Sequence, residues 1–245
     1  MPRLIVTFAL AFAAAVAAPA AQTFTSGPKP VALLELFTSE GCSSCPPAER
    51  WLAGLRAAPE LWREVVPVAW HVTYWDSLGW KDAYAAKAFT ARQYAYASLW
   101  HSDSVYTPCL ARNGREWHLG EAAAQMAGDA GKLTVTWAGH GQCQVDYTAP
   151  AGAPPGAYVV TVVLLGGGLT CEVQAGENAG RMLGHEFVAW QTARADLTTD
   201  RTGHHTATVR LPADNRPLPP IRALAAWITV GGALAPVQAT GGWLD

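Results

Sequence analysis

The feature of this sequence that most constrains its fold is a pair of cysteines placed between an apolar run and a helical pattern. Val31–Phe37 is almost entirely apolar, which is typical of a strand buried on both faces. Cys42-Ser43-Ser44-Cys45 follows at once, and residues 48–55 then place apolar side chains at helical spacing. Pro46 and Pro47 suit the first turn of that helix, because a proline has no N–H to donate.

The rest of the first half predicts further strands and helices in a definite order. Those elements are a strand over Val65–Tyr74, a helix over Asp82–His101, two short strands over Tyr106–Arg112 and Arg115–Leu119, and a helix over Gly120–Ala130. Asn113-Gly114 lies between the two short strands and is a strong hairpin signal. The order β-α-β-α-β-β-α is that of the thioredoxin core, so we expect an α/β thioredoxin-like domain over residues 30–132.

The second half has a different residue pattern. Short β-like runs separated by Gly- and Pro-rich segments occupy residues 133–245, and no helical pattern longer than two turns appears. We expect a mostly β C-terminal domain here, a small sandwich packed on the first domain. The strand order of this domain is not readable from the sequence.

The N-terminus predicts export. Arg3 precedes an almost unbroken apolar run over 4–18, and Ala18-Pro19-Ala20 offers a site for signal peptidase. We expect a signal peptide over 1–20, a flexible lead over 21–29 and a periplasmic or secreted protein. The alternative is an uncleaved anchor, but the run is short for a membrane span of about 20 residues. After cleavage, no stable membrane span is expected.

Composition excludes one class of partner. The net charge is −2, only 15% of the residues are charged, and no dense basic run occurs, so no nucleic acid is expected to bind.

The cysteine pair carries the predicted chemistry. At the first turn of a helix, unpaired N–H groups and the helix dipole stabilise a thiolate, so the pKa of Cys42 is expected below the value of about 8.5 of a free thiol. Cys42 would attack a substrate disulfide and Cys45 would resolve the mixed disulfide. The dithiol is itself the redox group, so neither a cofactor nor a metal is expected. The partners would be a thiol or disulfide substrate, protein or small molecule, and an unidentified redox partner that recycles the pair.

Thr107-Pro108 is the second predicted part of the site. Thioredoxin-like domains place a cis-proline at the start of the strand that faces the cysteine pair. In that role Pro108 would pack over the sulfurs, and the backbone of Thr107 would bind the substrate chain. The alternative is an ordinary trans proline that opens an edge strand.

Four polar or aromatic residues near the second strand are accessory candidates. His71 is expected to be a hydrogen-bonded core histidine, although an acid–base or metal role is open. Trp75, Asp76 and Trp80 follow the strand, where they could form a rim for a substrate peptide or simply pack.

The remaining cysteines have separate expectations. Cys109 follows Pro108, where it would either modulate the pair or act as a small buried apolar side chain. Cys143 and Cys171 fall in the β-rich half, and in an oxidising compartment we expect them to form a structural disulfide.

Four boxes resemble those of an exported bacterial family of unknown function with a thioredoxin-like domain. They are Leu34–Ala48, His71–Asp82, Val105–Pro108 and Gly176–Arg181. The resemblance implies a thioredoxin-like fold and a redox pair, but no substrate. This chain departs from the family pattern at Thr73, where an acidic residue is preferred, and also at Cys109 and Phe187. Without an acid at position 73, Asp76 or His71 would have to relay protons.

Two other functions stay open. Cys42 and Cys45 could hold copper(I), a soft ion that suits thiolates, with His71 or Cys109 completing the site. The chain could also be a binding module in which the Cys42–Cys45 bridge is inert.

Overall fold

The structure, a computed structural model, describes residues 21–122, 126–153 and 156–245. Its elements in chain order are β1 (Gln22–Thr25), β2 (Ala32–Thr38), α1 (Pro46–Gly54), η1 (Leu55–Ala57), β3 (Val65–His71), η2 (Tyr74–Leu78), α2 (Lys87–Leu99), β4 (Cys109–Arg112), β5 (Arg115–Trp117), β6 (Lys132–Trp137), β7 (Gln142–Thr148), β8 (Tyr158–Gly167), β9 (Leu169–Glu172), β10 (Met182–His185), β11 (Val188–Asp196), β12 (Thr198–Thr199), β13 (His204–Arg210), β14 (Ile221–Val230) and β15 (Gln238–Leu244). The expected signal peptide over 1–20 lies outside the described residues.

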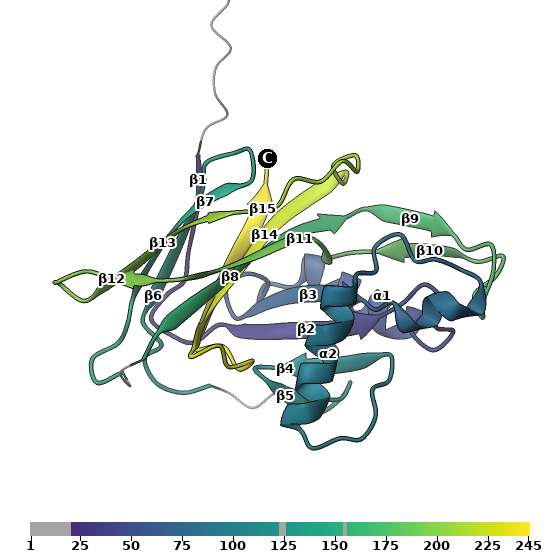
Figure 1. The fold of residues 1–245 in the computed structure, drawn as a ribbon, viewed down its shortest axis with the longest axis horizontal. Coiled ribbons are helices and arrows are strands. Elements are labelled where there is room, and N and C mark those ends of the chain that lie inside the picture. Colours follow the sequence, from purple (N-terminus) through teal and green to yellow (C-terminus); the bar gives the residue numbers. More distant parts are fainter. Residues whose placement is uncertain (1–20, 123–125, 154–155) are drawn as a thin grey trace, which may run out of the picture.

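The expected fold class, an α/β thioredoxin-like domain followed by a separate β domain, is wrong. The protein is mostly β, with 42% of the residues that the structure describes in strands and 14% in helices. One sheet of eight strands, in the order β15-β14-β8-β11-β3-β2-β4-β5, combines strands from both halves of the chain (Figure 1). The two halves therefore share a sheet instead of packing as an α/β domain against a sandwich.

The junction between the two halves explains this difference. β11 pairs in parallel with β3 through Val188 and Ala69, and antiparallel with β8 along most of its length. The edge of β3 that a separate first domain would leave open is thus covered by a strand from the second half. Because such pairing depends on contacts far apart in sequence, the local apolar pattern did not show it.

The long strands of the second half contribute side chains to two hydrophobic cores. In β8, Val163 and Leu165 belong to the core shared with β2 and β3, whereas Val162 and Leu164 belong to a second core. That second core is closed by the five-stranded sheet β1-β6-β7-β13-β12, which contributes side chains such as Val145. A strand that faces two cores is buried on both faces, which is why β8 is apolar at nearly every position.

Several local predictions hold within this architecture. β2 and β3 are parallel, with α1 in the connection, and β4 and β5 form a hairpin. Asn113 and Gly114, at the turn of that hairpin, both have positive φ, the conformation that a two-residue hairpin turn of this sequence requires.

Other local expectations differ from the structure. The lead over 21–29 contains β1, which pairs with β6. The helix expected over Gly120–Ala130 falls partly on 123–125, outside the described residues, and the described residues beside them are not helical. In the parts of the chain that the structure covers, no helix is long and apolar enough to cross a membrane.

A two-stranded sheet positions the site. β9 and β10 pair antiparallel and extend beyond the large sheet toward α1 (Figure 1). The end of β10 thereby approaches the helix that follows the cysteine pair, and it carries His185 into the core.

Candidate redox site and the buried polar cluster

The cysteine pair closes a disulfide at the start of a helix. Cys42 is bonded to Cys45, and α1 begins at the next residue, Pro46. Both cysteines are fully buried, whereas the intervening Ser43 and Ser44 are exposed. The pair therefore lies just beneath the surface under a two-serine loop.

Cys42 faces the segment that holds the predicted proline. Its Sγ lies 3.6 Å from the carbonyl oxygen of Thr107 and 3.3 Å from the hydroxyl oxygen of Ser44. The Thr107–Pro108 peptide bond is cis, as predicted. Trp75 donates from Nε1 to the Thr107 hydroxyl at 2.8 Å, so this rim candidate does lie at the site.

The turn over 176–181 holds the cysteine loop from the second half of the chain. Asn178 is fully buried and donates from Nδ2 to the carbonyl oxygens of Glu40 and Cys42, each at 2.8 Å. Glu177 accepts from the backbone N–H of Ser43 at 3.0 Å and from its hydroxyl at 2.7 Å. These hydrogen bonds lower the pKa of Glu177, which is itself exposed to solvent.

The sequence also matches a known protein family. Residues 33–229 match the family described as "Protein of unknown function (DUF1223)". The chain belongs to the DUF1223 family. Because the match runs from β2 to β14, it includes the cysteine loop, the Thr107–Pro108 bond and the 176–181 turn.

Solved structures support the fold of this DUF1223 protein. It is similar to protein AGR_C_4864 from Agrobacterium tumefaciens, at 22% identity and a TM-score of 0.56, over 89% of this chain and 96% of that one. It is also similar to HBP35 of Porphyromonas gingivalis, at 14% identity and a TM-score of 0.62, over 90% of this chain and 77% of that one. No curated protein matches the sequence.

A buried polar cluster lies behind the cysteine loop of this DUF1223 protein. Its members are Glu40, Glu49, His71, Asp82 and His185, all less than 9% exposed. Nδ1 of His71 lies 2.7 Å from Asp82 Oδ2, and Nδ1 of His185 lies 2.6 Å from Glu49 Oε2. The two imidazole rings are 5.1 Å apart between centroids. The cluster thus joins the ends of β3 and β10 to the loop before α1.

The charges of the cluster shift its pKa values in opposite directions. Burial alone would lower the pKa of His185, but the Glu40 and Glu49 carboxylates outweigh it and raise this pKa to about 10. Burial alone would raise the pKa values of Glu49 and Asp82, but contact with His185 and His71 respectively lowers them. The cluster is therefore held together by opposite charges in a nearly dry environment.

The accessory candidates fall at or near this cluster. His71 is a buried, hydrogen-bonded histidine, as expected. Trp80 donates from Nε1 to Glu40 Oε2 at 2.7 Å, and Asp76 accepts the backbone N–H of Asp82 at 3.3 Å. Burial raises the pKa of Asp76. Thr73 instead bonds to Thr90 on α2, so the position where the family prefers an acid holds a hydroxyl contact.

The structure does not form the expected Cys143–Cys171 disulfide. Both cysteines are free, because Cys143 lies in β7 of the five-stranded sheet and Cys171 in β9 of the two-stranded sheet. Cys109 is also free and buried. Its pKa is raised to about 11, chiefly by burial, and Tyr106 and Gln93 are near its thiol. This placement agrees with the small, buried side chain favoured for Cys109.

Sequence analysis missed five residues of the site: Glu40, Glu49, Asp82, Asn178 and His185. One of them had a local signal. Glu49 shares the buried face of α1 with Ala48 and Leu52, and a charged side chain on such a face requires a partner. Asn178 lies in the Gly176–Arg181 box, but nothing local to it indicates its partners, and His185 had no signal, because its partners lie far away in the sequence.

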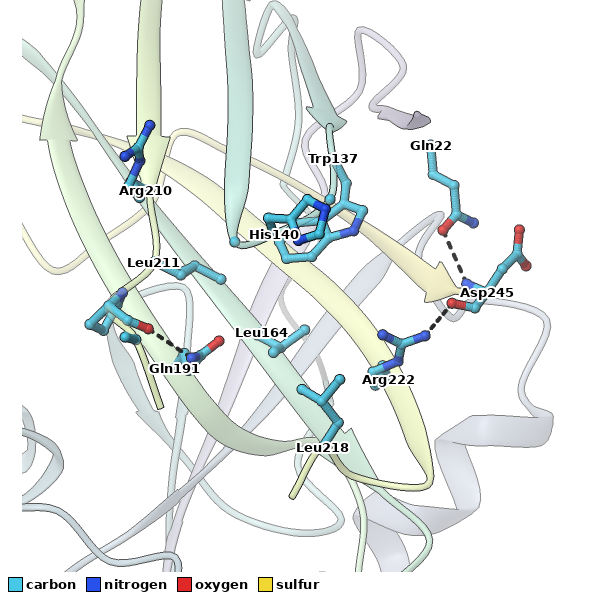
Figure 2. Close-up of a pocket in the computed structure, with 14 residues that line it drawn as sticks. Gln22, Trp137, His140, Leu164, Gln191, Arg210, Leu211, Leu218, Arg222 and Asp245 are labelled. Atoms are coloured by element: carbon cyan, nitrogen blue, oxygen red, sulfur yellow. Dashed lines mark hydrogen bonds between the residues drawn. The ribbon is translucent and has the colours of Figure 1, made fainter. Parts of the chain in front are cut away.

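Figure 2 shows a cavity with a different set of lining residues. It has a volume of about 650 Å³, and its lining includes Trp137, His140, Arg210 and Arg222. Arg222 donates to the backbone carbonyl of Asp245 at the cavity edge. None of the residues that line this cavity is a cysteine, so it does not extend the candidate redox site.

Proposed function

We propose that this DUF1223 protein is an exported thiol–disulfide oxidoreductase whose redox group is the Cys42–Cys45 pair. The observation that carries the proposal is the disulfide at the first turn of α1, with Cys42 Sγ facing the carbonyl of Thr107 beside a cis-proline. Such a carbonyl can accept an N–H from an extended substrate chain while the sulfur of that chain meets Cys42.

The reaction needs only the two thiols and a substrate disulfide. The Cys42 thiolate attacks one substrate sulfur, forms a mixed disulfide and expels the other sulfur as a thiolate. The Cys45 thiolate then attacks Cys42 Sγ, which releases the second substrate thiolate and restores the Cys42–Cys45 bond. Two electrons pass to the substrate, and its two thiolates take up protons from solvent. With an oxidising role, the same steps run in reverse.

The site also indicates how the first thiolate is stabilised. Cys42 lies just before α1, so it is near the positive end of the helix dipole. The Ser44 hydroxyl, 3.3 Å from Cys42 Sγ, can donate to a thiolate. Both features favour a lowered pKa for Cys42 in the reduced protein.

A substrate must gain access to the cysteine pair, because the loop over the pair is closed. Both sulfurs are buried, and the Ser43–Glu177 hydrogen bonds hold the loop over them. The exposed Ser43 and Ser44 are the part that would move to admit a substrate. Local opening of such a loop costs much less free energy than global unfolding.

One observation favours a second function, a binding module with an inert bridge. Cys42 and Cys45 are each 0% exposed, and a bridge that no reductant reaches does no redox work. The two functions make different predictions for the potential of the pair.

The decisive measurement is the reduction potential of the pair in the folded protein. The protein is equilibrated with glutathione buffers and its free thiols are then alkylated and counted, with Cys42→Ser as the control. A potential between about −120 and −270 mV supports the oxidoreductase. A potential below about −300 mV, with no thiol modified until the protein unfolds, contradicts it and leaves the inert bridge.

A further inference from the structure

We propose that His71, His185 and Glu49 bind one divalent transition-metal ion, of the zinc type, in the buried polar cluster. This site is distinct from the cysteine pair and does not depend on the proposed redox function. It uses imidazole and carboxylate ligands, whereas the copper alternative considered from the sequence uses the Cys42 and Cys45 thiolates.

The spacing of the three side chains fits one ion. Each offers one ligand atom, and these atoms lie within 4.8 Å of one another. Zinc is bound by imidazole nitrogen and carboxylate oxygen at about 2.0–2.2 Å. An ion at the centre of the three atoms therefore requires only small rotations of buried side chains.

Two imidazole nitrogens are left without partners in the cluster. Nε2 of His71 and Nε2 of His185 are buried and form no hydrogen bond, and the residues themselves are 1% and 2% exposed. Glu40 Oε1 is also unpartnered and lies 3.4 Å from His185 Nε2. Buried polar atoms without partners are costly, and a cation that displaced the imidazole protons would satisfy these atoms together.

The orientation of His71 is that of a metal ligand. Its Nδ1 contacts Asp82, which leaves Nε2 free to point into the cluster. Asp82 in turn accepts the backbone N–H groups of Glu40 and Tyr84 at 2.9 Å each, so its position is fixed. A carboxylate that holds the far nitrogen of a ligating histidine orients the ring and raises its basicity. Asp82 is thus a positioning residue.

The cluster contains more carboxyl groups than imidazoles. Three buried carboxylates, those of Glu40, Glu49 and Asp82, face only two imidazoles. Across the described ranges, no lysine or arginine forms an ion pair with any of the three. A divalent cation bound among these side chains would compensate the excess of buried carboxyl groups over imidazoles.

A free thiol of β9 lies beside the cluster. His185 pairs with Leu169, and Cys171 pairs with Leu183, so Cys171 and His185 lie on the same face of the two-stranded sheet. Cys171 is a free thiol, and Glu40 is close enough to contribute to its raised pKa. The ligand set of two imidazoles and one carboxylate favours zinc over magnesium or calcium, which prefer oxygen ligands.

An ion can approach the cluster from the protein surface. A cavity of about 540 Å³ is lined by Asp82, Tyr84 and Trp190 among others. The Tyr84 ring lies 5.4 Å from the His71 ring and 5.5 Å from the His185 ring. Movement of this one side chain would connect the cavity to the ligand nitrogens.

The test is a metal titration of the full chain after removal of metal with EDTA, with the Cys42–Cys45 disulfide intact so that these sulfurs cannot ligate. We expect one equivalent of Zn²⁺ or Co²⁺ to bind with a Kd below about 1 μM. Asp82→Asn should weaken binding by about 10–100-fold. His71→Gln and His185→Gln should each weaken it by at least as much. His204→Gln, at an exposed histidine of β13, is the matched control and should bind as the unmodified protein does.

Spectra of bound Co²⁺ give a readout that does not depend on the stability of a variant. Visible bands of a four-coordinate ion, with water as the fourth ligand, are expected for the unmodified protein and should be lost in His71→Gln and His185→Gln. The proposal is contradicted if the oxidised protein binds neither ion, or if His71→Gln and His185→Gln bind normally. Binding that appears only after reduction and disappears in Cys42→Ser would also contradict it, because the ion would then belong to the cysteine pair.

Discussion

At the residue scale, the cysteine loop depends on two neighbouring side chains that do different work. Asn178 is buried and donates to two carbonyl oxygens of the loop, those of Glu40 and Cys42. Glu177 is exposed and holds only Ser43, at the outer edge of the loop. The first side chain fixes the shape of the loop, and the second controls how readily it opens.

This division predicts a change in access without a change in fold. Glu177→Ala removes both hydrogen bonds to Ser43, so the loop should open more often and dithiothreitol should reduce the Cys42–Cys45 disulfide several-fold faster. Glu172→Ala, at an exposed glutamate of β9, is the matched control and should leave the rate unchanged. The rate is measured by alkylation of the released thiols with time. Equal rates in both variants would show that the loop does not limit access.

At the element scale, buried polar contacts decide where α2 and the β4–β5 hairpin lie. Glu35, in the middle of β2, accepts from Arg92 on α2 and from Trp70 Nε1, which fixes the helix over the sheet. Asn113 accepts the backbone N–H of Leu33 at 2.8 Å, which fixes the hairpin turn beside β2. These elements are therefore placed by specific hydrogen bonds as well as by apolar burial.

The hairpin turn gives a sharp stability prediction. A Cβ at Gly114 would lie 2.7 Å from the Cβ of Ala235, and the residue has a φ of +82°. Gly114→Ala should therefore destabilise the protein by about 1–3 kcal/mol. Gly54→Ala is the matched control, since Gly54 ends α1 with a negative φ and no atom lies within 4 Å of its added Cβ. It should be neutral or stabilising by up to about 1 kcal/mol. Urea denaturation measures both, and equal midpoints would contradict the prediction.

Sequence reasoning recovered the parts of the site that depend on local chemistry. The cysteine pair, the helix after it, the cis Thr107–Pro108 bond and the Asn113-Gly114 turn each have a signal within a few residues. The buried cluster has no such signal, because Glu49 and His185 meet across 136 residues of chain. Local patterns do not specify pairings of that kind.

At the scale of the whole molecule, one sheet unites two cores. Trp227 of β14 is fully buried and contacts Trp70 of β3 at 6.4 Å between ring centroids. Its neighbour Ile228 faces the other core, toward the five-stranded sheet. The apolar runs of the second half were interpreted as strands of a separate sandwich because burial on both faces looks the same whichever layers cover a strand.

A shared sheet predicts a single unfolding transition. Because β3 and β11 pair directly, residues 30–132 cannot lose their structure without exposing Val188 and the core beside it. Unfolding in urea followed by far-UV circular dichroism and by tryptophan fluorescence should give coincident curves. Two separated transitions would show that the halves are independent and would contradict the prediction. The control is Met182→Ala, at an exposed side chain, which should leave both curves in place.

The contact between Asn178 and the cysteine loop also bears on the order in which the chain is made. Synthesis runs from the N-terminus, so Cys42 is made 136 residues before Asn178, the side chain that holds its loop. At about 5–20 residues per second, the two thiols spend several seconds or more without that cover. During this interval the loop lies open, so both thiols are accessible to other molecules before the site that later encloses them has formed.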